Sequence, residues 1–303
     1  MPPPRAIRPG DAFVPSAVRS DEALLNVAVK AVRKGHRVLN RCAQRLDRLN
    51  AAAKQDNPTN LVTQADTEVE AAVIEEIRTF FKHDAILAEE LSGEEPDVAA
   101  LMQRDAPRTW VIDPIDGTTN FVHGYPHYAV ALAYVEDGRV RLGVISSAAT
   151  GELFTVVRGA GALLDGHAMR VSGRTQLRGA LLANCSHGRE TDALQHDNLA
   201  TYRDLYSKRL TIRRTGSAVL DMAYVAAGRL DGFWGSGLQP WDMAAGGLMI
   251  AEAGGLISDY SAADNWMQTG QVVCGAPQCY AGILHSVMQR SRPAEEPAGE
   301  SPD

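Results

Sequence analysis

The sequence predicts a layered α+β fold, and three observations lead to that prediction. Two long helical patterns occupy the first eighty residues, and a run of strand patterns follows them. Asp137-Gly138 provides a hairpin turn between the first two of these strands, which indicates antiparallel pairing. No G-x-G-x-x-G segment or Walker loop stands between a strand and a helix, so a doubly wound nucleotide-binding sheet is not expected.

Length and charge limit the classes of protein to consider. The 303 residues suffice for one large domain or two fused halves, and 45% apolar with 22% charged residues is ordinary for a globular enzyme. A net charge of −7 argues against broad nonspecific binding of nucleic acid, although it leaves room for a local basic patch.

Cysteine spacing and hydropathy indicate a soluble cytoplasmic protein. The four cysteines are scattered without a C-x-x-C pair, so reduced thiols are expected. No apolar run approaches the roughly 18 residues that span a membrane, and the first residues lack the apolar core of a signal peptide. We expect a flexible arm at 1–20, a folded domain at 21–290 and a disordered acidic tail at 291–303.

Apolar spacing places the helices. The first starts at Ser20-Asp21 and keeps helical spacing for more than twenty residues, towards Leu49. After a loop at 54–60, Asp66 opens the second helix as its N-cap. Further helices are predicted over 218–227, from Trp241 and over 278–289.

Strands are predicted where short β-favouring runs are bounded by turn residues. They are expected at 85–88, 110–112, 128–135, 140–146, 152–157, 181–184, 230–234 and 272–274, with a loop over 235–240.

The stretch from Trp110 to Phe121 carries the chemistry around which the chain is organised. Its strand is expected to end at Pro114, with Asp113 and Asp116 on either side of the corner. Two carboxylates about 4 Å apart repel by roughly 4 kcal/mol at an effective dielectric of about 20, so a divalent cation is the simplest partner. Gly117 and the two threonines after it suit a phosphate. The alternative is an ordinary Asp-Pro-x-Asp-Gly surface turn.

Other acidic residues occupy matching places at the ends of strands or the starts of helices. Glu89 and Glu90 follow the strand at 85–88, and Asp242 lies in the first turn of a helix rich in small residues. Since these ligands are all oxygen, the predicted ion is Mg²⁺ rather than zinc, and two or more such ions form a clamp for phosphoryl hydrolysis. For Asp66 and Asp242, helix capping alone is the competing explanation.

Three motifs, in this order, resemble the signatures of the inositol monophosphatase family of Mg²⁺-dependent, Li⁺-sensitive phosphatases. They are Glu89-Glu90, Asp113-Pro-Ile-Asp-Gly-Thr-Thr-Asn-Phe121 and Trp241-Asp-Met-Ala-Ala-Gly246. Arg213–Ser217 and Ala223–Arg229 are similar to the bacterial SuhB-type branch of that family. The resemblance implies an α-β-α-β-α layered sandwich of the inositol monophosphatase / fructose-1,6-bisphosphatase type, commonly a homodimer, with its catalytic domain at 21–290.

The resemblance also implies a role for each matching residue. Metal ligands would be Glu89, Asp113, the Ile115 carbonyl, Asp116 and Asp242, for two to three Mg²⁺ ions, with Glu90 in support. Thr118 with Glu89 would activate the attacking water, and Asp66 would support that threonine. Asp116, the backbone of Gly117 and Thr118, Ser217, Ala218 and position 235 would contact phosphate or substrate.

Departures from the family pattern leave the substrate open. Gly235 stands where a glutamate usually contacts inositol hydroxyls, so we expect Gly235→Glu to raise activity on inositol 1-phosphate. Asn60, Gln55 and Leu91 also differ from the common residues. The leading function is hydrolysis of inositol monophosphate or a similar polyol phosphate. A nucleotide 3′-phosphate or histidinol phosphate is an alternative substrate, and association with RNA polymerase or its elongation factors is an alternative role.

Overall fold

A computed structural model describes residues 20–45, 51–54, 57–92, 96–186, 194–196, 198–289 and 291–293. For 51–54, 57–63, 194–196 and 291–293 it describes the backbone alone. The predicted arm before residue 20, the tail after residue 293, Leu46, Leu49, Gln55 and the side chain of Asn60 lie outside these residues. Among the described residues, no helix is both long and apolar enough to cross a membrane.

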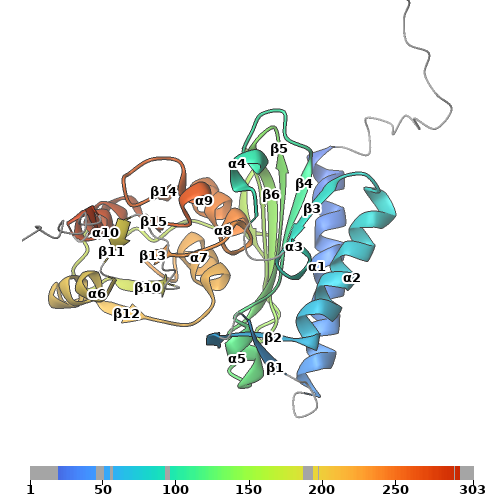
Figure 1. The fold of residues 1–303 in the computed structure, drawn as a ribbon. Helices are drawn as coiled ribbons and strands as arrows, with labels where there is room; N and C mark the ends of the chain where they lie inside the picture. Colours follow the sequence, from blue (N-terminus) through green and yellow to red (C-terminus); the bar gives the residue numbers. More distant parts are fainter. Residues whose placement is uncertain are drawn as a thin grey trace, which may run out of the picture.

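Five layers alternate between helices and sheets, as the family resemblance implied (Figure 1). The first layer contains α1 (Asp21–Ala43) and α2 (Gln64–Phe80), which cover one face of a seven-stranded sheet. Helices α7 (Ala218–Ala226) and α8 (Pro240–Glu252) lie between this sheet and a second, five-stranded sheet. The outer layer contains α6 (Asn198–Ser207) and α10 (Pro277–Met288).

The larger sheet has the order β3-β4-β5-β6-β7-β8-β9 and is antiparallel except for the pair β3–β4. Its strands are β3 (Ala85–Ala88), β4 (Thr109–Asp116), β5 (Ala129–Glu136), β6 (Arg139–Ser147), β7 (Leu153–Val157), β8 (Gly161–Leu164) and β9 (His167–Ala168). The predicted hairpin is present, since Glu136 pairs with Arg139 across Asp137-Gly138.

The smaller sheet has the order β12-β10-β13-β15-β14. Its strands are β10 (Leu181–Ser186), β12 (Thr211–Arg213), β13 (Gly232–Ser236), β14 (Leu256–Ser258) and β15 (Val272–Gly275). Short elements complete the fold: β1 (Ala51–Lys54), β2 (Asn57–Thr63), α3 (Glu89–Ser92), α4 (Val98–Leu101), α5 (Thr118–Val122), β11 (Leu194–His196), α9 (Trp266–Thr269) and β16 (Ser291–Pro293).

Several predicted boundaries were wrong. The loop expected at 54–60 is part of a hairpin in which β2 begins at Asn57. Residues 291–293, assigned to a disordered tail, form β16 and pair with β11. All four cysteines are free and buried.

Close packing between the middle helix layer and the large sheet brings the two halves of the chain together. A Cβ added to Gly143 of β6 would lie 2.9 Å from Cα of Ala245 in α8, and one added to Gly246 would lie 2.6 Å from Cβ of Met222 in α7. Only small residues fit at these contacts. They allow the first turn of α8 to approach the end of β4, where the predicted site lies.

Candidate metal and phosphate site

An irregularity in β4 directs two of the predicted ligands to one side of the sheet. The strand continues through Pro114 to Asp116, so the prediction that proline ends it was wrong. Asp113 pairs with Ala131 and Asp116 pairs with Ala129. Between these two pairs β4 advances by three residues and β5 by only two, so β4 contains one extra residue. Residues three apart on a regular strand face opposite sides, and one extra residue returns them to the same side. Proline is tolerated there because its missing N–H falls outside the regular ladder.

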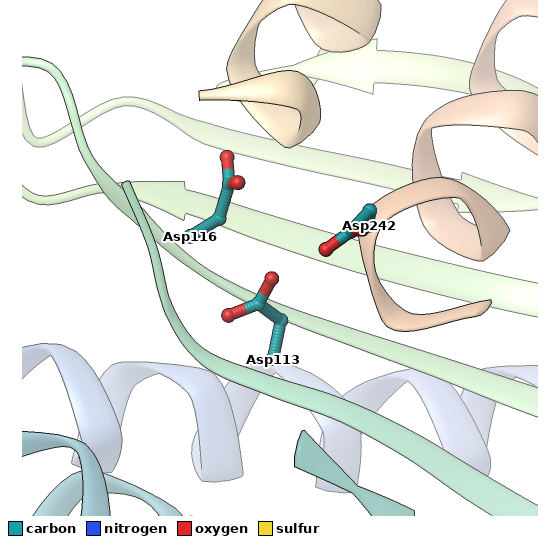
Figure 2. Close-up of side chains that lie close together, drawn as sticks. All are labelled: Asp113, Asp116 and Asp242. Carbon is teal, nitrogen blue, oxygen red and sulfur yellow. The ribbon is translucent and has the colours of Figure 1, made fainter. Parts of the chain in front are cut away.

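The third carboxylate comes from the first turn of α8. Asp242 accepts a hydrogen bond from the backbone N–H of Gln239 at 2.7 Å, within a reciprocal capping box. Helix capping therefore explains part of its presence, as the alternative interpretation held. The same position also brings Asp242 to the end of β4, where its carboxylate faces those of Asp113 and Asp116 (Figure 2).

These three side chains form the acidic cluster of the site. One ligand atom from each of Asp113, Asp116 and Asp242 lies within 4.8 Å of the other two. Asp113 and Asp116 are buried, and Oδ1 of Asp113 has no hydrogen-bond partner among the described residues. Two unit charges at that separation repel by about 3.5 kcal/mol at an effective dielectric of about 20. An all-oxygen cluster with an unpaired buried acceptor fits a divalent cation such as Mg²⁺.

Burial and crowding make these groups hard to ionise without a cation. Burial raises the pKa of Asp113 well above its ordinary value, and the charges of Glu89, Asp116, Asp242 and Asp66 raise it further. Burial also raises the pKa of Asp116 to about 7, although two hydrogen bonds oppose this shift. They come from the Ser217 hydroxyl and from the backbone N–H of Val219, the latter at 2.9 Å.

Glu89 and Glu90 form the first turn of α3, directly after β3. Glu89 is close enough for its charge to act on Asp113, as expected for a residue of the same site. The backbone N–H of Glu90 donates to Oε2 of Glu70 at 2.8 Å. Glu70 is buried, and burial raises its pKa with added contributions from the charges of Glu90 and Glu89.

Glu70 was not predicted as a residue of the site, although the sequence carries a signal for it. It follows Asp66 by four residues on α2, so the two carboxylates share a helix face. Asp66 itself lies inside the first turn of α2, which begins at Gln64, so its assignment as N-cap was wrong. It is fully buried.

The predicted catalytic threonine sits where a helix begins. Gly117 caps α5 with φ of 89°, and a Cβ there would lie 3.0 Å from the carbonyl oxygen of His127, so glycine is required. The Thr118 hydroxyl is 2.9 Å from the Ile115 carbonyl oxygen and 3.1 Å from Oδ1 of Asp66. Thr118 therefore connects a predicted metal ligand to a buried carboxylate.

Ser217 caps α7 and holds Asp116 in place through its hydroxyl. Ala218 is buried beside it, and its predicted substrate contact stays a prediction. The turn before Ser217 is fixed by Nδ2 of Asn120, which donates to the carbonyl oxygens of His127 at 2.7 Å and Thr215 at 2.8 Å.

Beside this turn lies a pair that no sequence pattern indicated, the partly buried His127 and the buried Asp221. Nε2 of His127 is 3.8 Å from Oδ1 of Asp221, and the Thr215 hydroxyl donates to Oδ2 of Asp221 at 2.7 Å. The charges of His127 and Asp221 act on Asp116 in opposite directions. The pair thus belongs to the electrostatic surroundings of the site.

Gly235 lies within β13 and not in the loop that the sequence predicted. It pairs with Cys185 of β10, and an added Cβ would lie 2.3 Å from the Cys185 carbonyl oxygen. Any side chain at this position requires the backbone to shift. Position 235 therefore offers no side chain to a substrate, and the expected effect of Gly235→Glu on substrate choice has to be revised.

Comparisons with known proteins agree with this geometry. The model of the inositol monophosphatase family matches residues 20–292. Nus factor SuhB of Pseudomonas aeruginosa is 39% identical over 274 residues, which cover 90% of this chain and 98% of that protein.

Two solved structures extend the similarity to the fold. The extragenic suppressor protein suhB of Bartonella henselae has a TM-score of 0.78 and 34% identity, covering 88% of this chain and 98% of that one. The IMPase of Thermotoga maritima has a TM-score of 0.74 and 32% identity, covering 88% and 97% respectively.

Proposed function

This chain belongs to the inositol monophosphatase family, and from that premise we propose that it hydrolyses inositol monophosphate or a similar polyol phosphate. The observation that carries the proposal is the acidic cluster of Asp113, Asp116 and Asp242, in which a buried oxygen of Asp113 has no hydrogen-bond partner in the described part of the chain. A surface turn of Asp, Pro and Gly has no reason to bury two carboxylates beside a third from a distant helix.

The cofactor in this proposal is Mg²⁺, with two to three ions per site. Glu89, Asp113 and the Ile115 carbonyl would hold one ion, and Asp113, Asp116 and Asp242 a second, with a weaker third at Glu89. Bound Mg²⁺ supplies charge stabilisation for phosphoryl transfer and a water of lowered pKa. Lithium inhibition is part of the same proposal.

The chain's own residues position the reactants. Thr118, paired with Glu89, would orient and deprotonate the attacking water, and Asp66 would support that threonine through the contact between its Oδ1 and the Thr118 hydroxyl. The backbone N–H groups of Gly117 and Thr118 would contact the phosphate. The hydroxyl of Ser217 donates to the Asp116 carboxylate, which favours its ionised form and lowers its pKa against the effect of burial.

A matched pair of variants tests the metal assignment. Asp113→Asn keeps the side-chain volume but removes the central charge, so Mg²⁺-dependent phosphate release from inositol 1-phosphate should fall to background, while the circular dichroism spectrum stays native. Asp105→Asn removes one carboxylate from an exposed position and should leave turnover unchanged. Normal turnover by Asp113→Asn would exclude the proposed ligand set.

A panel of phosphate esters is needed to identify the substrate. Inositol, sugar and polyol phosphates, a nucleotide 3′-phosphate and histidinol phosphate should be compared with and without Mg²⁺ and Li⁺. We propose that a polyol phosphate gives the highest kcat/KM; a preference for the nucleotide or for histidinol phosphate would select the alternative substrate.

A second candidate function is a regulatory association with RNA polymerase or its elongation factors. The observation that favours it is the similarity to a relative named Nus factor SuhB. Capture of polymerase by both the wild-type chain and Asp113→Asn would support a role that does not need catalysis. We also propose a cytoplasmic homodimer, which light scattering tests for its mass and cell fractionation for its location.

A further inference from the structure

The outer face of α1 carries a row of positive charge that the proposed hydrolysis does not use. We call it the basic stripe. It consists of five exposed residues: Lys30, Arg33, Arg37, Arg41 and Arg45. Arg45 lies in the turn just after the helix. The stripe is positive although the whole chain has a net charge of −7.

Within the described part of the chain, no carboxylate pairs with Arg33, Arg37 or Arg41. Glu68, Glu75 and Glu76 of the neighbouring α2 have partners other than these arginines. The Lys34 ammonium forms ion pairs with the carboxylates of Glu75 at 3.1 Å and Glu76 at 3.5 Å. Gln64 and the Cys42 thiol donate to Glu68 at 2.8 and 3.6 Å.

Helix stability does not explain the stripe. Positive charge in the last turn of a helix is favourable, which accounts for Arg41 and Arg45. Arg33, Arg37 and Arg41 nevertheless stand four residues apart, and like charges at that spacing destabilise a helix. A glutamate in place of one of these arginines would remove the repulsion between like charges.

The spacing of the stripe fits a chain of phosphates. Steps of three or four residues at 1.5 Å per residue separate the charges by about 4.5–6 Å, over a length of about 22 Å. That length suits the lower end of the roughly 4–16 nucleotides that single-strand sites cover. Four of the five residues are arginines, whose planar fork of N–H donors matches phosphate oxygens.

Two features favour a single strand over a membrane or a duplex. Figure 1 shows α1 lying along the large sheet, and the apolar residues of α1 are buried in the cluster that it shares with that sheet, so the helix has no apolar face to insert into lipid. At one end of the stripe Phe80 is 42% exposed, and the Lys30 ammonium lies 5.7 Å from the centroid of its ring. An exposed ring beside positive charge is a stacking platform for an unpaired base.

We propose that the basic stripe binds single-stranded RNA through its phosphates, without sequence preference. RNA is the nucleic acid that ordinarily presents unpaired strands. This activity is separate from the proposed hydrolysis, because α1 lies on the opposite face of the large sheet from α8, which carries Asp242.

The test uses the full chain and a labelled 12-nucleotide oligouridine in fluorescence anisotropy. Five phosphate contacts predict a slope of about −3.5 for log K against log salt. The triple variant Arg33→Gln, Arg37→Gln, Arg41→Gln loses three contacts, so the slope should become shallower by about 2 and the affinity at 0.1 M salt should fall about 100-fold.

A control triple removes the same charge elsewhere. Arg104→Gln, Arg139→Gln and Arg203→Gln change three exposed arginines outside the stripe and should weaken binding by less than about threefold. Circular dichroism and phosphate release should be unaffected in both triples, which separates this proposal from that of hydrolysis.

Three results would overturn the proposal. The first is equal RNA binding by the wild-type chain and the stripe triple, and the second is an equal loss in the control triple. The third is tighter binding to oligothymidine, duplex RNA, anionic phosphatidylserine vesicles or polyglutamate than to oligouridine.

Discussion

Titration of the acidic cluster offers a direct test of the site without any substrate. In the metal-free protein the pKa of Asp116 is raised from 3.8 to about 7, first by burial. Between these two values the folded protein holds a proton that the unfolded chain has released. The free energy of unfolding must therefore fall as the pH rises through this window.

The size of the effect follows from the shift. About three pKa units correspond to roughly 4 kcal/mol for Asp116 alone, of which roughly 2–3 kcal/mol falls between pH 5 and pH 8. Asp116→Asn has no such proton to lose. Urea unfolding in EDTA should show the wild-type chain losing that amount relative to the variant over this pH range.

Metal ions should reverse the result at pH 8. Mg²⁺ at about 100 times its Kd adds about 2.7 kcal/mol to the wild-type chain and far less to Asp116→Asn. Ser217→Ala provides a second test, because it removes a hydrogen bond that lowers the pKa of Asp116. Its Mg²⁺ affinity should weaken and its dependence on pH should move to higher pH.

Two outcomes would contradict the raised pKa of Asp116 and its role as a metal ligand. Should the difference between wild type and Asp116→Asn be the same at pH 5 and pH 8 in EDTA, Asp116 is not a buried acid of raised pKa. Equal stabilisation of both proteins by Mg²⁺ would place the ion elsewhere.

Two further substitutions examine the neighbouring residues. Thr118→Val removes the hydroxyl shared by Ile115 and Asp66 and should lower kcat by about 10²–10⁴-fold with little change in KM, whereas Thr118→Ser should keep most of the activity; equal kcat values for the two variants would rule out a role for the hydroxyl. Gly235→Ala places a Cβ against the Cys185 carbonyl and should cost about 1–3 kcal/mol in urea unfolding, whereas the control Gly173→Ala, where nothing lies within 4 Å of an added Cβ, should leave the midpoint unchanged; an unchanged midpoint for Gly235→Ala would show that the strand yields freely. For the same reason Gly235→Glu should lower stability before it alters substrate preference.

Much of the fold was predictable because its signals are local. Apolar periodicity located α1, α2 and α10, and β-favouring runs located β3, β5, β6 and β15 to within a few residues. The motifs around Glu89, Asp113 and Asp242 were recognisable because each lies at the junction of two elements.

Other features were beyond local patterns. Pro114 was expected to end β4, but β4 continues beyond it because Asp116 pairs with Ala129 of β5. Gly235 was expected in a loop, and the ladder to Cys185 placed it in a strand. In both cases hydrogen bonds to distant residues outweighed the preference of the residue itself.

The sequence by itself determined which residues supply carboxylates and hydroxyls, and that these sit at the ends of strands and the starts of helices. Only the tertiary structure decided that Asp242 meets Asp113 and Asp116, because small residues let α8 pack closely against the sheet. It alone also set the environment of each carboxylate, including the partners Glu70, His127 and Asp221. The residue type fixes the functional group, but the pKa of a carboxylate depends on burial and on neighbours that folding brings from elsewhere in the chain.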